Sequence, residues 1–252
     1  MQENNYYDDP ERYEAEVAPF HADLNWYLKR VSELGQPILE LGCGTGRLLF
    51  LLATGGIEAD GLDNSVPMLA RAKTRALLLG PTIGGRVNLF QKDMRSFALR
   101  RRYRVVLAPF NVLMHLHTDE DFLACLRCIR RHLEEDGTLI FDVSNPQPAL
   151  LDTIGEQQPV EQRSIRIRGL SYLQRERHLY NPSTGLSVTT YTFEPEGHDE
   201  PPVTTSLSLR MYSPPHLEEL LKSGTFKIIN RYGDFSNNQL SESSVVQVVE
   251  AK

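Results

Sequence analysis

Three glycines at alternate positions limit the folds open to this chain more than any other segment. Gly42, Gly44 and Gly46 lie between an apolar run that is typical of a buried strand and an apolar run that is typical of a helix. Glycine is needed where a chain turns tightly and where a ligand must lie against bare backbone. In open α/β sheets, ligands bind at such turns, at the carboxyl ends of the strands. The segment therefore predicts an α/β sheet with a ligand site at this turn.

The pattern along the chain supports a parallel sheet with helices on both faces, because strand-like and helix-like segments alternate up to about residue 145. Near the C-terminus, two strand-like segments are joined by a connection too short for a crossover helix, so they should form an antiparallel hairpin at one sheet edge. We expect strands at 37–41, 57–62, 87–90, 103–108, 138–143, 226–231 and 245–251, and helices at 47–53, 67–79, 120–133 and 214–222.

A second pattern interrupts the first. Residues 160–212 alternate with period two, and turn-forming residues occur at 181–185 and 194–202, which predicts about four antiparallel strands. We interpret this segment as an inserted β lid. The whole chain, 1–252, is then a single domain, in which residues 1–30 form an N-terminal arm and helix, and residues 31–159 and 213–252 form a Rossmann-like core.

Charge and cysteine content exclude several classes of protein. The net charge is 27 − 33 = −6, and residues 1–25 alone contribute 1 − 7 = −6, so the remainder is neutral. The basic run at 100–104 is too short for a nucleic-acid footprint and is interpreted as a solvated turn. Three cysteines give no disulfide framework, Cys125 and Cys128 fit a helix core, and neither a signal peptide nor an apolar run of 18 residues occurs. We therefore expect a cytoplasmic protein without a membrane or nucleic-acid partner.

An acidic residue identifies the kind of ligand. Asp63 follows Gly42 by 21 residues, at the end of the second expected strand, where a carboxylate accepts hydrogen bonds from ribose hydroxyls. Arg47 stands where a dinucleotide-binding turn needs its last glycine. A buried Glu40 would repel a phosphate but suits an ammonium group. A ligand with both a ribose and an amino-acid ammonium group points to S-adenosylmethionine.

Residues 37–145 resemble class I S-adenosylmethionine-dependent methyltransferases, through the segments 39–46, 61–69 and 91–94. The resemblance implies a seven-stranded, mostly parallel sheet and methyl transfer from that cofactor. It also implies that Glu40 and the glycine turn hold the methionyl part, Asp63 the ribose, and the residues after the second and third strands the adenine. The cofactor-binding set implied in this way is Tyr13, Glu40, Leu41, Gly42, Cys43, Gly44, Gly46, Asp63, Asn64, Met68, Asp93, Met94 and Phe110.

The N-terminal arm, residues 6–13, resembles the arm that folds over the cofactor in small-molecule methyltransferases of the amino-sugar or glycine type. Aromatic faces attract a sulfonium cation, and Tyr13, followed by Tyr7, is the expected partner. The alternative is that both tyrosines only pack the arm. Trp26 and Tyr27 lie on an amphipathic helix and are expected in the core.

His115 is the candidate catalytic residue. It matches the histidine that follows the fourth strand in amino-sugar N-methyltransferases, which implies a base or a residue that orients the acceptor. A histidine in the wall of the site is the alternative. We expect no metal site, because His115 and His117 have no third ligand in register, and we expect His117 to begin the next helix.

The acceptor is expected to be a small molecule, methylated on nitrogen or oxygen. Residues 108–111, Ala-Pro-Phe-Asn, depart from the pattern of enzymes that methylate amino groups of DNA bases, and the glutamate pair of protein-arginine methyltransferases is absent. Lid arginines could meet an anionic substrate or face solvent, and a homodimer is left open. Two other functions stay open: an RNA methyltransferase, supported by the 100–104 run, and a non-catalytic S-adenosylmethionine-binding module.

Overall fold

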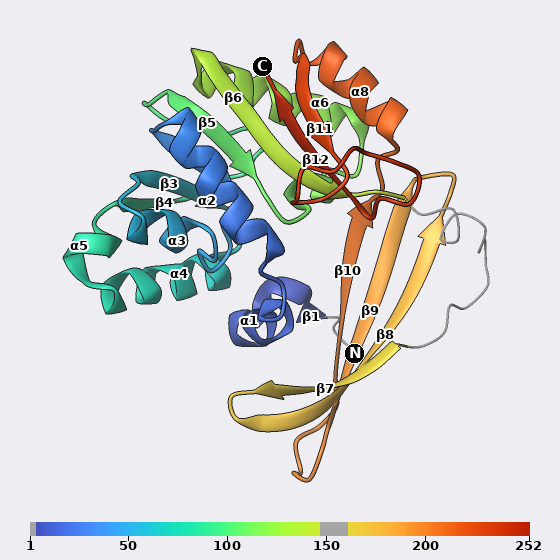
Figure 1. Cartoon of the computed structure of the whole chain (residues 1–252). Coiled ribbons are helices and arrows are strands. Elements are labelled where there is room, and N and C mark those ends of the chain that lie inside the picture. Colours follow the sequence, from blue (N-terminus) through green and yellow to red (C-terminus); the bar gives the residue numbers. More distant parts are fainter. Residues whose placement is uncertain (1–3, 147–160) are drawn as a thin grey trace.

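The computed structural model describes residues 4–146 and 161–252, and its central element is a seven-stranded sheet (Figure 1). The strand order is β11–β12–β6–β5–β2–β3–β4. Strand β12 is antiparallel to both neighbours, and the pairs from β6 to β4 are parallel. This confirms the Rossmann-like sheet with a C-terminal antiparallel hairpin. The strands are β2 Ile38–Leu41, β3 Ala59–Asp63, β4 Val87–Gln91, β5 Tyr103–Ala108, β6 Leu133–Ser144, β11 Ile228–Tyr232 and β12 Val246–Ala251.

Helices cover both faces of this sheet, because successive side chains of a buried strand point to opposite faces. Leu39 and Val106 pack on the face covered by α6 and α8, whereas Ile38 and Val105 pack on the face covered by α2 and α3. Neither face of β2 or β5 is left to solvent, so both strands are mostly apolar, as the sequence predicts, with Glu40 as a buried exception on β2. The helices of the core are α2 Ala22–Leu34, α3 Leu49–Thr54, α4 Val66–Leu78, α5 Gly80–Gly84, α6 Asp119–His132 and α8 Pro214–Ser223.

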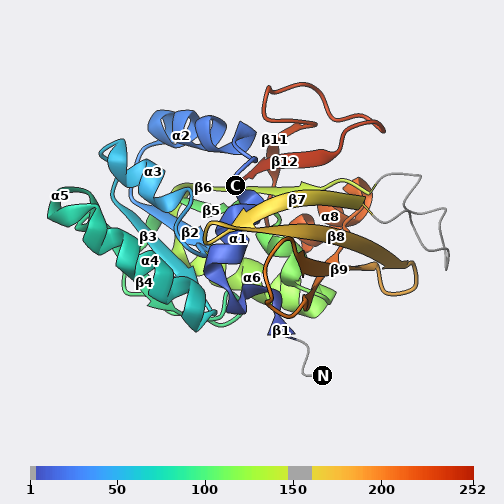
Figure 2. The same ribbon diagram turned by 90° about the horizontal axis from the view of Figure 1, so that it is seen from below.

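A second, five-stranded sheet lies beside the core in the order β1–β10–β9–β8–β7 (Figure 2). Its four antiparallel strands confirm the expected lid strands, and β1 adds to β10 as an unexpected parallel strand of two asparagines. The expected boundary between core and lid, at residues 159 and 160, lies outside the described residues. The strands are β1 Asn4–Asn5, β7 Glu161–Ile167, β8 Leu170–Asn181, β9 Leu186–Pro195 and β10 Val203–Arg210.

The N-terminal arm connects the two sheets. It contains the short 3₁₀ helix η1, Tyr6–Asp8, and the helix α1, Pro10–Val17. Both contact α4 of the core, while α1 also contacts β7 and η1 contacts β10. In the described part of the chain, no helix has the length and hydropathy needed to cross a membrane.

The three glycines of the turn all have a positive φ, which side chains rarely adopt: +57° at Gly42, +56° at Gly44 and +81° at Gly46. A Cβ at Gly46 would also lie 2.4 Å from the ring of Phe50, too close for any real contact. The turn therefore needs glycine both for its backbone conformation and for close packing.

Replacing Gly46 with Ala should lower the free energy of unfolding by about 2–4 kcal/mol, since the left-handed conformation and the clash with Phe50 add up. Gly56 is a matched control, because its φ is +86° and a Cβ there would meet no atom within 4 Å. Gly56→Ala should therefore lose only about 1 kcal/mol in urea unfolding. Equal losses in the two variants would show that the turn can shift away from the clash.

Candidate active site

The candidate site lies at the carboxyl edge of the central sheet, where the strand order reverses direction. Strand β2 has β3 on one side and β5 on the other, so the connections that leave β2 and β5 run to opposite sides. Such a switch point forms a crevice outside the strand ends. The glycine turn follows β2, and residues 109–111 follow β5, so both segments border this crevice.

Asp63 is hydrogen-bonded directly to the glycine turn. One of its carboxylate oxygens accepts a hydrogen bond from the backbone N–H of Gly44 at 2.8 Å, and the other accepts one from the N–H of Ser65 at 2.8 Å. Burial raises the pKa of Asp63, while these backbone donors partly oppose the shift. The turn and the acid at the predicted spacing are therefore one connected unit. Each carboxylate oxygen has further lone-pair positions that a ligand hydroxyl could use.

Glu40 is the least satisfied charged group of this crevice. Glu40 lies near the end of β2 and is 3% exposed. None of the described residues donates a hydrogen bond to its Oε2. Burial raises the pKa of Glu40 to about 8, with Arg47 opposing the shift. Arg47 cannot fully serve as its counter-ion, since its guanidinium also donates to Asp23 at 3.0 Å. A buried carboxylate without a donor is costly unless a cation or donor arrives.

The other expected cofactor residues lie along the same edge. The Sδ-methyl of Met68 lies 3.3 Å from where a Cβ of Gly44 would be, and Asn64 follows β3. Asp93 follows β4, but Arg95 donates to both of its oxygens, which lowers the pKa of Asp93. Leu41 at the end of β2 and Cys43 within the turn are buried, and Met94 packs partly against the core.

The N-terminal arm carries a cluster of tyrosines whose rings pack together. The ring centroids of Tyr6 and Tyr7 are 5.0 Å apart, and those of Tyr7 and Tyr13 are 5.9 Å apart. Burial raises the pKa of Tyr13 to about 12, and the charges that act on it include Arg47, Asp63 and Glu40. Asp63 and Glu40, the two acids expected to bind cofactor, are thus among the charges that act on the Tyr13 hydroxyl.

His115 pairs with this arm. Its Nε2 lies 2.9 Å from the hydroxyl oxygen of Tyr7, a residue that stands 108 positions earlier in the chain. Burial, and less strongly the charge of His117, lowers the pKa of His115 to about 4. Burial also raises the pKa of Tyr7 far above its ordinary value, so both groups are neutral near pH 7. A neutral imidazole can accept a proton or position an acceptor.

The expectation that His117 begins the next helix is wrong. Thr118 is the N-cap of α6, and its hydroxyl accepts a hydrogen bond from the N–H of Asp121. The Nε2 of His117 lies 2.9 Å from the backbone oxygen of Ser208 on β10. His117 therefore connects the core to the lid. Within the described ranges, no group of three or more His, Cys, Asp or Glu residues could hold a metal ion.

Sequence reasoning missed Asp142, which shapes the segment after β5. Phe110 and Asn111 have positive φ angles of 57° and 66° although neither is glycine. The buried Asp142 accepts hydrogen bonds from the N–H of Phe110 at 2.8 Å and from the hydroxyl of Tyr27 at 2.7 Å. Burial raises the pKa of Asp142 to about 6. The sequence feature that could have revealed this role is an isolated acidic residue within the otherwise apolar expected strand 138–143.

Phe110 is also held from its other side. The Arg47 guanidinium carbon lies 4.5 Å from the centroid of the Phe110 ring, and Phe20 makes an edge contact at 6.1 Å between centroids. Phe20, which follows α1, Arg47, which follows the glycine turn, and Phe110, which follows β5, thus meet at one place. Trp26 and Tyr27 are buried, which confirms their expected place in the core.

Two lid arginines bind the arm. Arg168 donates to Asp9 at 2.6 Å and to Glu11 at 2.5 Å, and Arg163 donates to the backbone oxygen of Glu16 at 3.4 Å. These side chains therefore connect the lid with the arm.

Comparison with known proteins gives matches over most of the chain. Residues 38–137 match the family described as "Methyltransferase domain". YqeM of Bacillus subtilis (strain 168) is 26% identical over 90% of this chain and 87% of its own length. The dTDP-3-amino-3,6-dideoxy-alpha-D-glucopyranose N,N-dimethyltransferase of Streptomyces fradiae is 32% identical, over 48% of this chain and 44% of that enzyme. The structure of the CcbJ methyltransferase from Streptomyces caelestis aligns with a TM-score of 0.80 at 24% identity, over 98% of both chains.

Proposed function

We propose that this chain, which is an S-adenosylmethionine-dependent methyltransferase, moves the methyl group of that cofactor to a nitrogen or oxygen atom of a small-molecule acceptor. The observation that carries the proposal is the unpaired Oε2 of the buried Glu40 beside the glycine turn. An ammonium group is the natural partner for that oxygen, since a phosphate would be repelled. Among nucleoside cofactors, S-adenosylmethionine supplies such a group.

The residues present fit the parts of this cofactor. Glu40 would hold the ammonium group, Asp63 the ribose hydroxyls, and Met68 with Asn64 the adenine, while the Tyr13 ring would face the sulfonium. When bound, the cofactor supplies an electrophilic methyl group, so the protein chiefly aligns the reactants and excludes water. The tyrosines of the arm, whose rings pack against one another, would serve the second task by covering the bound cofactor.

His115 would act on the acceptor. An amine or hydroxyl that gains a methyl group must lose a proton, and a neutral imidazole at the crevice can take it. The Tyr7 hydroxyl fixes the Nε2 edge of that ring at 2.9 Å, so Tyr7 is a positioning residue for His115. The amino-sugar enzyme of Streptomyces fradiae makes an amine the first acceptor to test.

The proposal favours a small molecule over nucleic acid. In the basic run 100–104, Arg101 pairs with the Glu58 carboxylate, and Arg104 donates to the backbone oxygen of Leu34. Those two cations are therefore partly engaged within the protein and offer less to a phosphate backbone.

Calorimetry and product detection test the proposal together. S-adenosylhomocysteine, which keeps the ammonium group and the ribose, should bind, and NAD should not, because Arg47 stands where the pyrophosphate turn needs glycine. With methyl-labelled S-adenosylmethionine, a panel of amino sugars and other small amines should yield a labelled product. Tighter binding of NAD than of S-adenosylhomocysteine would contradict the cofactor assignment. Cofactor binding without product from any nitrogen or oxygen acceptor would favour a non-catalytic binding module.

A further inference from the structure

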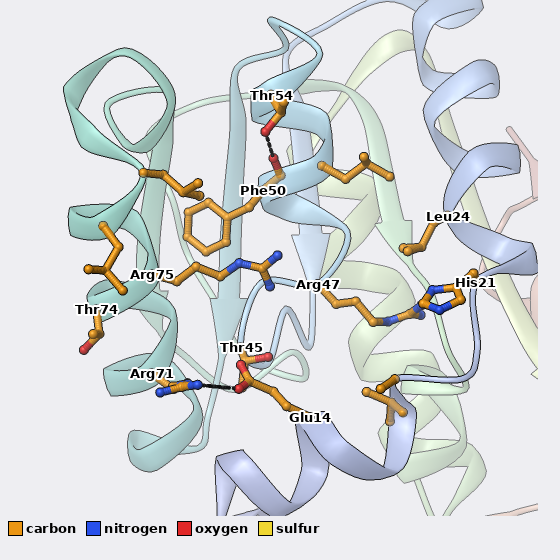
Figure 3. A pocket seen from close by; sticks show the side chains of 15 residues that line it. Glu14, His21, Leu24, Thr45, Arg47, Phe50, Thr54, Arg71, Thr74 and Arg75 are labelled. Atoms are coloured by element: carbon orange, nitrogen blue, oxygen red, sulfur yellow. Dashed lines mark hydrogen bonds and ion pairs between the residues drawn. The ribbon is translucent and has the colours of Figure 1, made fainter. Parts of the chain in front are cut away.

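A pocket of about 610 Å³ lies beside the glycine turn, where the arm meets helices α3 and α4 (Figure 3). Its walls include Glu14 and Val17 of α1, Phe50 of α3, and Arg71 and Arg75 of α4. Thr45 of the glycine turn and its neighbour Arg47 also line it, whereas Glu40, Asp63 and His115 do not.

Helix α1 contributes Glu14 and Val17 to the pocket wall. Burial raises the pKa of Tyr13, and the charges of Asp63 and Glu40, two acids of the crevice, add to this shift. The next residue, Glu14, instead lines the pocket and accepts a hydrogen bond from Arg71 at 2.7 Å. Of these two neighbouring residues of α1, only Glu14 lines the pocket.

The pocket contains one cation that lacks an anion. Arg47 is paired with Asp23, and Arg71 with Glu14. Arg75 has no carboxylate partner among residues 4–146 and 161–252, and its guanidinium carbon lies 5.3 Å from the centroid of the Phe50 ring. Figure 3 shows the Arg75 side chain extending from α4 into the pocket, next to that ring. The guanidinium keeps its donors available for an anionic group.

The remaining surface of the pocket is largely apolar. Leu24 and Leu51 contribute to its open surface, and Leu78 at its edge is 83% exposed, whereas Val17 and Phe50 line it at only 6% and 1% exposure. Exposed apolar surface that is grouped around a cation is informative in a way that a single exposed leucine is not. A ligand for this surface needs an apolar body as well as a negative charge.

We propose that this pocket is a second ligand site, separate from the cofactor crevice, which binds a small organic acid through Arg75 and holds its apolar body against Leu51 and Leu78. The arm helix α1 forms one wall, so the bound acid contacts the arm and the core at once. The site goes beyond the methyl transfer proposed above and does not depend on it.

Titration calorimetry with naphthalene-2-carboxylate tests the site, in protein saturated with S-adenosylhomocysteine and in protein without it. The acid should bind in both, and hydrogen exchange should slow in α1, α3 and α4. The uncharged analogue naphthalene-2-carboxamide should bind about tenfold more weakly, because it cannot form charge-assisted hydrogen bonds with Arg75. Arg75→Met should cause a similar loss for the acid, whereas Lys73→Gln removes a charge from the same helix outside the pocket and should cause none.

Several results would overturn the proposal. Competition between the acid and S-adenosylhomocysteine would place the acid in the crevice. Equal binding of the acid and the amide to the unaltered protein would show that Arg75 attracts no anion, and this comparison needs no variant to fold. Absence of binding by the acid up to its solubility limit would exclude the site.

Discussion

Glu40→Gln should stabilise the cofactor-free protein and weaken S-adenosylhomocysteine binding by about 100-fold or more, because it removes a buried charge that only the ligand satisfies. The Oε2 of Glu40 has no donor among the described residues, so its charged form is costly in the free protein. The same charge is what should hold the cofactor ammonium. One substitution therefore changes stability and affinity in opposite directions.

The stabilisation should depend on pH in a defined way. Burial raises the pKa of Glu40 to about 8, above its ordinary value, so the folded protein binds a proton that the unfolded chain releases between those two pH values. The contribution of Glu40 to stability therefore falls as pH rises from about 4.5 towards about 8. Urea unfolding without cofactor should show parent and Glu40→Gln alike near pH 5 and the variant more stable near pH 9, by about 1–3 kcal/mol.

Asp60→Asn is the matched control for Glu40→Gln. Asp60 is also a buried acid of the sheet, but it accepts hydrogen bonds from Tyr103 and Asn88, both at 2.7 Å. Removing a satisfied carboxylate should destabilise the protein and leave cofactor affinity close to that of the parent. If Glu40→Gln binds S-adenosylhomocysteine as tightly as the parent, Glu40 does not hold the ammonium group.

The sequence was sufficient to predict elements whose cause is local. Parallel strands buried on both faces are apolar at consecutive positions, so 103–108 was predicted with the limits that β5 has in the structure. The three turn glycines were identifiable because their spacing follows from positive φ angles within a few residues. The lid strands were visible for a similar reason, since one-sided burial produces period-two alternation.

The features that the sequence did not reveal depend on contacts between distant segments. Tyr7 and His115 are 108 positions apart, and neither carries a local sign that it pairs with the other. Asp142 lies in a strand that looks apolar, and its partner Phe110 is 32 positions away. Strand β1 consists of two asparagines and exists only because β10 offers it a free edge.

His115→Asn should lower kcat by about 10²–10⁴-fold while leaving S-adenosylhomocysteine affinity nearly unchanged, if His115 accepts the proton of the acceptor. His115 ends the short 3₁₀ helix that follows β5 and is not among the groups that would hold cofactor. Tyr7→Phe removes only the hydroxyl that lies 2.9 Å from Nε2 and keeps the ring of the arm. It should cause a smaller loss of kcat, and the double variant should lose little more than His115→Asn alone, because residues that act as a unit are not additive.

The pH profile separates a base from an orienting residue. Because burial lowers the pKa of His115 to about 4, its neutral form persists down to that pH, and the activity that requires it should be lost only as pH falls through about 4. An acidic limb near the ordinary histidine value of about 6.5 would instead belong to the acceptor or to another group. His117→Asn is the control, since His117 contacts the lid through Ser208. If His115→Asn raises KM but preserves kcat and the pH limb, His115 orients the acceptor. If the rate is unchanged, His115 only forms part of the wall of the site.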